Sequence, residues 1–188
     1  MPFVEIEKPE IVTVPYRQTK GDKDYGSCLW ARFNFDTKNY HLSVESDCGS
    51  FACGWYPTPG IETFLHLCSR FERSYLLDKI STRSVVNGEA THRSLIAWME
   101  DYDVYGYECL SEIQREEIEN ACHSNRNDYA VLRAIMDALA DTDFEGSCSE
   151  YDIACCVEMD YPSGAKKIAE IFVEHIRPVV EKLTEEES

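Results

Sequence analysis

The sequence predicts an α+β fold in which an antiparallel sheet built on a hairpin is followed by about five helices. Two observations predict it. The first third of the 188-residue chain contains short segments rich in aromatic and β-branched residues, and one of them alternates apolar and polar side chains. After residue 60, apolar residues recur at helical spacing instead. Strands that precede helices in this way favour an antiparallel sheet with helices packed against it.

Four segments of the first third have the composition of strands. The first mixes β-branched residues with charges and prolines, which suits an edge strand. The second and third flank a short polar turn, and this arrangement is typical of a hairpin. The fourth follows the turn Asp47-Cys48-Gly49 and ends at Pro57. The predicted strands span residues 4–14, 28–35, 40–46 and 50–56.

The rest of the chain shows helical spacing, apart from one short strand predicted within residues 149–160 and centred on 153–157. Asp128 and Ser163 are expected to cap the two helices that follow them. Pro178 should kink or shorten the last helix. The predicted helices span residues 60–71, 74–80, 87–99, 107–123, 128–139 and 163 onwards, the second being either separate or a continuation of the first. The last helix is expected to bury Ile168, Ile171, Phe172, Ile176 and Val179.

A single domain over residues 1–188 is predicted, mainly β over 1–59 and mainly α over 60–188, because no repeat or low-complexity linker divides the chain. No stretch approaches 18 consecutive apolar residues, and the N-terminus lacks a signal-peptide pattern. A cytoplasmic protein is therefore expected. The nine cysteines, an odd number without a Cys-x-x-Cys motif, then predict free thiols rather than a disulfide framework.

Charge is the unusual feature of the sequence. Thirty-five acids against 18 bases give a net charge of −17. Residues 98–160 hold 17 of the acids and only three bases, for a net charge of −14. This segment also contains many apolar residues, so it should fold and hold its acids on a fixed surface. Such a protein is expected to avoid nucleic acid and anionic membranes and to attract a basic partner.

The predicted helix over residues 107–123 carries four glutamates at positions i, i+4, i+8 and i+11, which share one face: Glu108, Glu112, Glu116 and Glu119. Like charges at this spacing weaken a helix, so they add nothing to its stability. A folded row of carboxylates can compete for a groove built to bind the phosphates of DNA or RNA. The alternative is a solvated face that only keeps the protein soluble. Further acids that could extend the row are Asp101, Asp103, Asp137, Asp141, Asp143 and Glu145.

Other candidate sites are weaker. Cys48, Cys53, His66 and Cys68 offer zinc-ligand types without the usual two-residue spacing, and Cys53 and Cys68 fit a strand and an apolar helix face. Cys122 and His123 are neighbours on a helix, so they do not face each other as a nucleophile and its base would. Asp141 and Asp143 could bind magnesium, but no further ligand set accompanies them. No metal, other cofactor or catalytic residue is therefore predicted.

A pattern between Trp30 and Lys79 carries a resemblance. It comprises Trp30-x-Arg32-Phe33, the run 42–51 with Ser46-Asp47-Cys48-Gly49-Ser50-Phe51, Trp55, Phe64-Leu65 and Tyr75-Leu76-x-x-Lys79. This pattern resembles a widespread group of small uncharacterised phage and prophage proteins. The resemblance implies a viral or mobile-element origin and hence the cytoplasm of a bacterial host. It also favours an anti-defence role, because phage inhibitors of nucleases are often small and acidic.

Three functional hypotheses follow. The first is an inhibitor, not an enzyme, that uses the acids to occlude the nucleic-acid groove of a host protein such as a CRISPR nuclease or a restriction enzyme. The second is a cysteine- or metal-dependent enzyme that acts on a nucleotide signal or on a defence protein. The third is an accessory protein whose acidity serves solubility alone. The first predicts a basic protein partner, without direct binding to nucleic acid or membrane.

Overall fold

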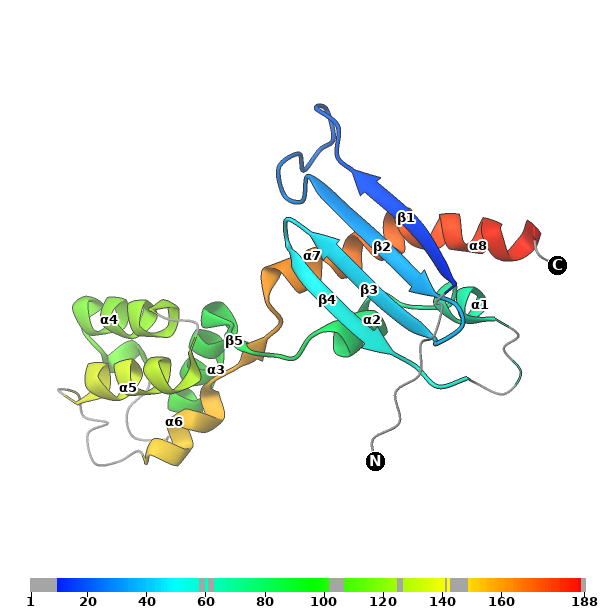
Figure 1. Ribbon diagram of the computed structural model, residues 1–188. Helices are drawn as coiled ribbons and strands as arrows, with labels where there is room; N and C mark the ends of the chain where they lie inside the picture. The colour runs from blue at the N-terminus through cyan, green and yellow to red at the C-terminus, as the bar shows by residue number, and fades with distance from the viewer. Residues whose placement is uncertain are drawn as a thin grey trace, which may run out of the picture. The chain divides into compact units, whose positions relative to one another are not determined.

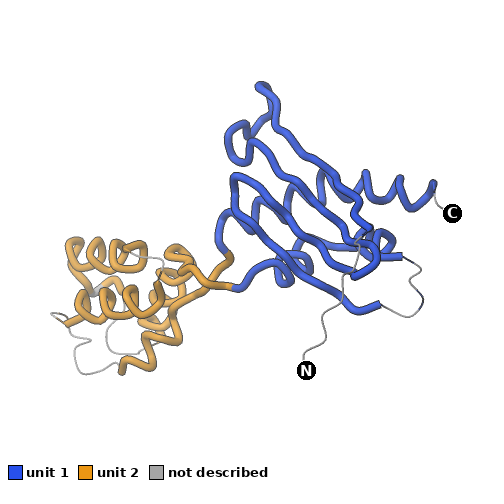
Figure 2. Tube along the Cα trace, in the orientation of Figure 1, with its two compact units in different colours: residues 1–82, 162–188 blue, residues 83–161 orange. Residues whose placement is uncertain are grey.

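The computed structural model (Figure 1) describes residues 10–57, 60, 63–101, 107–124, 127–140, 142 and 149–186. Contacts divide the chain into two compact units (Figure 2). Unit 1 comprises Met1–Thr82 and Pro162–Ser188, and unit 2 comprises Arg83–Tyr161. Unit 2 is thus inserted into the sequence of unit 1. A single domain over residues 1–188 stays a prediction.

Unit 1 contains a four-stranded antiparallel sheet in the order β1-β2-β3-β4, which confirms the α+β class. The strands are β1 Ile11–Arg17, β2 Trp30–Asp36, β3 His41–Ser46 and β4 Gly49–Gly54. The central pair is the predicted hairpin, with Phe33 opposite Val44. β1 overlaps the predicted strand at residues 11–14, and residues 4–9 of the predicted strand lie outside the described residues.

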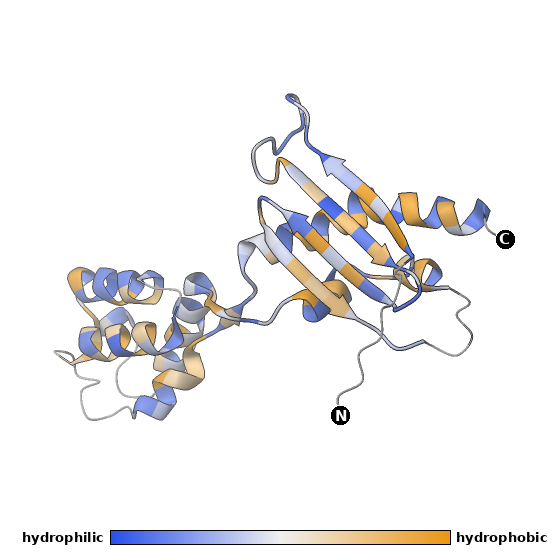
Figure 3. Cartoon of the chain, in the orientation of Figure 1, coloured by the Kyte–Doolittle hydropathy of each residue, from blue (hydrophilic) through white to orange (hydrophobic). Residues whose placement is uncertain are grey.

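One face of this sheet is buried because its side chains alternate, as the banded colours of β2 and β3 show (Figure 3). Phe33, Phe35, Leu42 and Val44 lie on the buried face. Phe172 packs between the layers, with its ring centroid 6.0 Å from that of Phe33. The helical segments of unit 1 are α1 Phe64–Cys68, α2 Arg73–Ile80, α7 Ser163–Ile171, the π-helical turn η2 Phe172–Ile176 and α8 Arg177–Glu186.

The last helical segment continues past Pro178 to Glu186 and includes the π-helical turn η2, so Pro178 does not shorten it, and a kink at this position stays a prediction. Proline has no N–H and its ring crowds the carbonyl four residues earlier, and the wide π turn η2 ends directly before this region. A π turn adds one residue and rotates the following side chains. Val180 is consequently buried (0% exposed) while Val179 is 41% exposed, so the prediction that Val179 points inward is wrong. Pro162 rather than Ser163 occupies the N-cap position of α7.

Unit 2 is helical, and its chain enters and leaves through two short paired strands. β5 Val85–Val86 and β6 Met159–Asp160 are antiparallel, with Val85 opposite Asp160. Buried Thr91 supports this pair by accepting a hydrogen bond of 3.0 Å from the backbone N–H of Glu158. The helices of unit 2 are α3 Gly88–Asp101, the 3₁₀ turn η1 Tyr107–Cys109, α4 Glu112–His123, α5 Asp128–Leu139 and α6 Glu150–Cys156. Its core includes Leu95, Met99, Ile118, Val131, Ile135, Leu139 and Ile153.

Two predictions about unit 2 are wrong for local reasons. The strand centred on 153–157 is the helix α6, because Ser149 and Asp152 form a capping box that starts a helix. Cys156 is accordingly buried and Cys155 exposed on a helix rather than on a strand. Asn127, not Asp128, caps α5, and its side chain accepts from the backbone N–H of Ala130. Within the described residues, the helices all fall short of the length and apolar character needed to span a membrane.

Candidate functional site

Three of the predicted glutamates share one exposed face of α4. Glu112, Glu116 and Glu119 are exposed, and successive members are roughly 6 Å and 4.5 Å apart along the helix axis. The other side of α4 buries Ile118 and Cys122 in the core of unit 2. The helix therefore fixes the direction in which the three carboxylates point.

Glu108 is also exposed, but it does not lie on α4. The single predicted helix over 107–123 is interrupted, because the side chain of Ser111 accepts from the backbone N–H of Gln114 and caps a new helix. Glu108 instead belongs to the 3₁₀ turn η1. The predicted row of four glutamates on one helix is therefore a row of three on α4, and Glu108 lies outside that helix.

Two more predicted acids are described and exposed: Asp101 ends α3 and Asp137 lies on α5. The remaining four predicted members, Asp103, Asp141, Asp143 and Glu145, lie outside the described residues. We call the described members the acid set: Asp101, Glu108, Glu112, Glu116, Glu119 and Asp137. All six belong to unit 2.

The positive charge of unit 2 is sparse. Arg83–Tyr161 contains 18 acids against five arginines and no lysine, a net charge of −13. Arg115, which is on α4 itself, donates from Nε to the carbonyl oxygen of Leu110 at 3.1 Å and lies over the ring of Tyr107. Where the structure describes both partners, no member of the acid set forms an ion pair. Within the described residues, the charge of the acid set is therefore not neutralised by ion pairs.

A contact that the sequence analysis missed holds η1 against α3. The imidazole Nε2 of His92 is 3.1 Å from the hydroxyl of Tyr107, and the two rings meet edge to face at 5.7 Å. Burial lowers the pKa of His92, with the nearby charge of Glu119 acting in the opposite direction. The ring is thus neutral at pH 7. Helical periodicity places His92 at the edge of the buried face of α3. It does not indicate that His92 contacts Tyr107.

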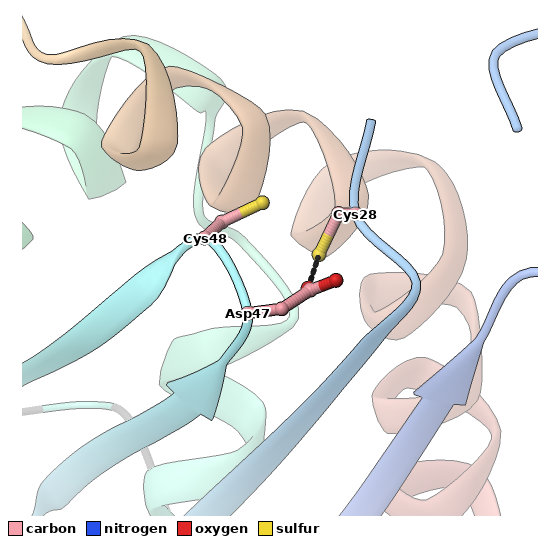
Figure 4. A group of neighbouring side chains, drawn as sticks. All are labelled: Cys28, Asp47 and Cys48. Carbon is pink, nitrogen blue, oxygen red and sulfur yellow. Dashed lines mark hydrogen bonds between the residues drawn. The ribbon is translucent and has the colours of Figure 1, made fainter. Parts of the chain in front are cut away.

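A second group of chemically active side chains lies in unit 1 (Figure 4). The ligand atoms of Cys28, Asp47 and Cys48 all lie within 4.8 Å of one another. The thiol of Cys28 donates to Oδ1 of Asp47 at 3.2 Å, and the backbone N–H of Leu29 donates to Oδ2 at 2.8 Å. The thiol of Cys48 donates to the carbonyl oxygen of Ser27 at 3.2 Å.

Burial raises the pKa of the Cys28 thiol, and Cys48 and Asp47 raise it further. Burial would also raise the pKa of Asp47, but the backbone N–H of Leu29 and the thiol of Cys28 outweigh it and lower that pKa. At neutral pH the group therefore consists of one carboxylate and a protonated thiol at Cys28.

This group differs from the four zinc-ligand types noted in the sequence. All four are described, yet they do not gather: Nε2 of His66 lies 2.9 Å from the guanidinium of Arg70, and among the described residues Cys48 groups with Cys28 and Asp47. Burial raises the pKa of Cys53 and of Cys122 to about 12, which opposes the thiolate that a nucleophile needs. The register of the β2–β3 hairpin could have indicated this group, because pairing Ala31 with Ser46 brings residue 28 close to the β3–β4 turn.

The pattern between Trp30 and Lys79 has structural roles in unit 1. Asp47 fixes the start of β2 as described above, and Gly49 adopts a φ of +126°, which favours glycine at this position. The indole N–H of Trp55 donates to the hydroxyl of Tyr75 at 2.9 Å, and its ring stacks on Phe71 at 4.9 Å. These residues build the sheet and dock α2.

Comparison with known proteins gives one match. The model of the family Phage_phiTE_072, described as a phage family, matches residues 4–182. No curated protein and no solved structure matches the chain.

Proposed function

Since the chain belongs to this phage family, whose model covers nearly its whole length, we propose that it serves the phage as an anti-defence inhibitor. The acid set of unit 2 binds the basic groove in which a host nuclease, such as a CRISPR nuclease or a restriction enzyme, holds nucleic acid. Inhibition is stoichiometric occlusion and needs no chemical step. The observation that carries the proposal is the net charge of −13 in unit 2, displayed partly on ordered helices.

The spacing of the carboxylates supports competition with nucleic acid. Along α4 the separations of roughly 4.5–6 Å are of the same order as the rise of about 3.4 Å per phosphate on one DNA strand. A groove lined with lysine and arginine would therefore meet several charges at once. Because α4 is packed against the core of unit 2, little conformational freedom of its backbone remains to be lost on binding.

The arrangement works against stability, which favours a binding role over chance. Glu112 and Glu116 are four residues apart, and such a like-charge pair weakens a helix by about 0.2–0.5 kcal/mol. Solubility alone is served equally well by acids spread over the whole surface. In this chain unit 1 carries a net charge of only −4, from 17 acids and 13 bases.

Exposed apolar and aromatic side chains occur on helices of the same unit as the acid set, two of them on α4 and α5. Ile113 is 70% exposed on α4, Tyr129 is 62% exposed on α5 and Tyr151 is 76% exposed on α6. Tyrosine is enriched among the residues that dominate binding energy at protein interfaces. Their presence supports a protein partner rather than a surface that only repels other molecules.

The test begins with capture of the target from host lysate treated with nuclease, using the tagged full-length protein, and proceeds to the activity of the purified target. The wild-type protein should abolish nuclease activity near equimolar ratio. The triple variant Glu112→Lys, Glu116→Lys, Glu119→Lys should bind at least about tenfold more weakly, a loss of about 1.4 kcal/mol.

A matched control makes the same change in net charge on unit 1. Glu72→Lys, Glu174→Lys, Glu185→Lys alters three exposed acids there and should inhibit as the wild type does. Equal loss in both variants would show that only overall charge matters. Full inhibition by the α4 variant, or inhibition far below equimolar ratio that chelation or thiol alkylation abolishes, would overturn the proposal and favour an enzyme.

A further inference from the structure

The group Cys28, Asp47 and Cys48 lies in unit 1, away in sequence from the acid set, and the proposed inhibitor role makes no use of it. Its members come from two segments, the loop just before β2 and the turn between β3 and β4, which the sheet brings together. Figure 4 shows the carboxylate of Asp47 beneath the sulfur of Cys28, with Cys48 next to Asp47 on the same turn.

We propose that these three side chains bind a zinc ion through two thiolates and one carboxylate oxygen. Thiolate and carboxylate donors suit zinc, whereas magnesium and calcium prefer oxygen donors alone. Tetrahedral zinc with sulfur at about 2.3 Å and oxygen at about 2.0–2.2 Å holds its ligand atoms roughly 3.3–3.8 Å apart. The observed separations, 3.2 Å between Cys28 Sγ and Asp47 Oδ1 and at most 4.8 Å for any pair of the three ligand atoms, bracket that range.

The two oxygens of Asp47 make different contacts, as the two oxygens of a metal-binding carboxylate commonly do. Oδ1 accepts from the thiol of Cys28 at 3.2 Å and more weakly from the backbone N–H of Trp30 at 3.5 Å, while Oδ2 accepts the backbone N–H of Leu29 at 2.8 Å. Ligating carboxylates are commonly held by such an outer hydrogen bond, which fixes their orientation. The hydroxyl of Ser46 accepts the backbone N–H of Cys48 at 3.1 Å and thereby also fixes the turn that carries the second thiol.

The fourth coordination position opens to solvent. Asp47 and Cys48 line a cavity of about 570 Å³ together with Ser163, Lys167 and Glu170. Water from this cavity completes the tetrahedron. Two thiolates and one carboxylate around Zn²⁺ leave a charge of −1. Lys167 lines the same cavity, where its ammonium pairs with Asp24 and Glu170.

Zinc replaces the thiol protons, so uptake depends on pH. In the metal-free protein the protonated thiol of Cys28 donates a hydrogen bond to Asp47. When zinc binds the sulfur, the thiol proton is released and this hydrogen bond is lost. Binding therefore releases protons, and affinity falls as the pH is lowered. The bound ion ties the loop before β2 to the β3–β4 turn.

The experiment uses the full-length protein, reduced and freed of metal, and titrates it with zinc in competition with a chromophoric chelator. We expect one equivalent to bind. Cobalt, used as a spectroscopic substitute, should give a thiolate-to-metal charge-transfer band together with the strong visible bands of tetrahedral coordination. Cys48→Ser and Asp47→Asn change partly or fully exposed residues and should weaken zinc binding by at least about 100-fold.

Cys53→Ser is the matched control, because Cys53 is a partly buried thiol in the same sheet that lies outside the group. It should bind zinc like the wild type, and circular dichroism verifies that every variant is folded. Failure of the wild-type protein to take up zinc would overturn the proposal. So would a cobalt spectrum without the thiolate band, or unchanged binding by Cys48→Ser, which would place the ion elsewhere.

Discussion

Gly164, near the start of α7, has no room for a side chain. A Cβ at this position would lie 2.1 Å from the backbone carbonyl oxygen of Cys48, a contact that only movement of the backbone can relieve. The same approach seats the β3–β4 turn, and with it Asp47 and Cys48, against the helix.

We therefore expect Gly164→Ala to lower the free energy of unfolding by about 1–3 kcal/mol, the usual cost of overpacking. Gly54→Ala is the control, since its Cβ would meet the nearest atom at an ordinary 3.6 Å. Urea denaturation of both variants and the wild type measures the difference. Equal midpoints for Gly164→Ala and the wild type would contradict this packing.

Asp152 makes α6 sensitive to acid. Its carboxylate accepts from the hydroxyl of Ser149 at 2.7 Å and from the backbone N–H of Ser149 at 2.8 Å, and these bonds lower its pKa. A group whose pKa is lower in the folded state adds stability above its unfolded value of about 3.9 and loses it as the pH falls through the folded value.

Asp152→Asn should consequently melt below the wild type at pH 7, and the gap between the two melting temperatures should narrow as the pH falls below about 3.9. Thermal unfolding followed by circular dichroism over this range tests the expectation. A gap in melting temperature that stays constant from pH 7 to pH 3 would show that the carboxylate charge does not contribute.

At the scale of elements, the binding role proposed for α4 conflicts with the stability of the helix. Glu116→Lys removes the repulsion with Glu112 and creates a favourable pair at the same spacing, so the helix should gain roughly 0.4–1 kcal/mol. The same substitution should weaken binding to the basic partner. Denaturant midpoints and affinity measured on one preparation reveal whether stability and binding move in opposite directions, and a variant that gains in both would contradict the proposed role of this face.

Much of the element order could be predicted from the sequence. The hairpin β2–β3 and the helix α5 have strong periodicity, and both occur as expected. The prediction of a strand within residues 149–160 was wrong. Ile153 and Cys156 suit a strand by composition, but the capping box of Ser149 and Asp152 starts a helix. In the same way Ser111 starts α4 and separates it from Glu108. Local hydrogen bonds of this kind override residue composition.

The candidate sites were predictable to different degrees. Exposure of Glu112, Glu116 and Glu119 follows from helical spacing, because the opposite face must be buried. The group around Cys28 depends on which residues of β2 and β3 lie opposite each other, and periodicity alone does not set that register. The contact between His92 and Tyr107 depends on how separate helical segments pack, and no sequence period encodes it.

At the scale of the whole molecule, charge is divided unequally, with −13 on unit 2 and −4 on unit 1. If the acid set drives association, the complex should respond strongly to salt. The screening length shrinks from about 10 Å at 0.1 M to about 3 Å at 1 M ionic strength. Over that range we expect affinity for the captured partner to fall at least about tenfold, mostly through slower association. Surface plasmon resonance measures both rates, and salt-independent binding would argue against this mode.

The short ladder of β5 and β6 holds the first and last residues of unit 2 next to each other. The 79 residues of unit 2 therefore connect Thr82 to Pro162 of unit 1 as a short loop would, because their two ends are paired. Joining these two segments of unit 1 does not require unit 2 to have a particular length or shape. A recombination event that replaced everything between the two strands would leave the sheet and its helices with the same chain path. If unit 2 is the target-recognition segment proposed above, a phage lineage can exchange it as a unit while unit 1 keeps its fold.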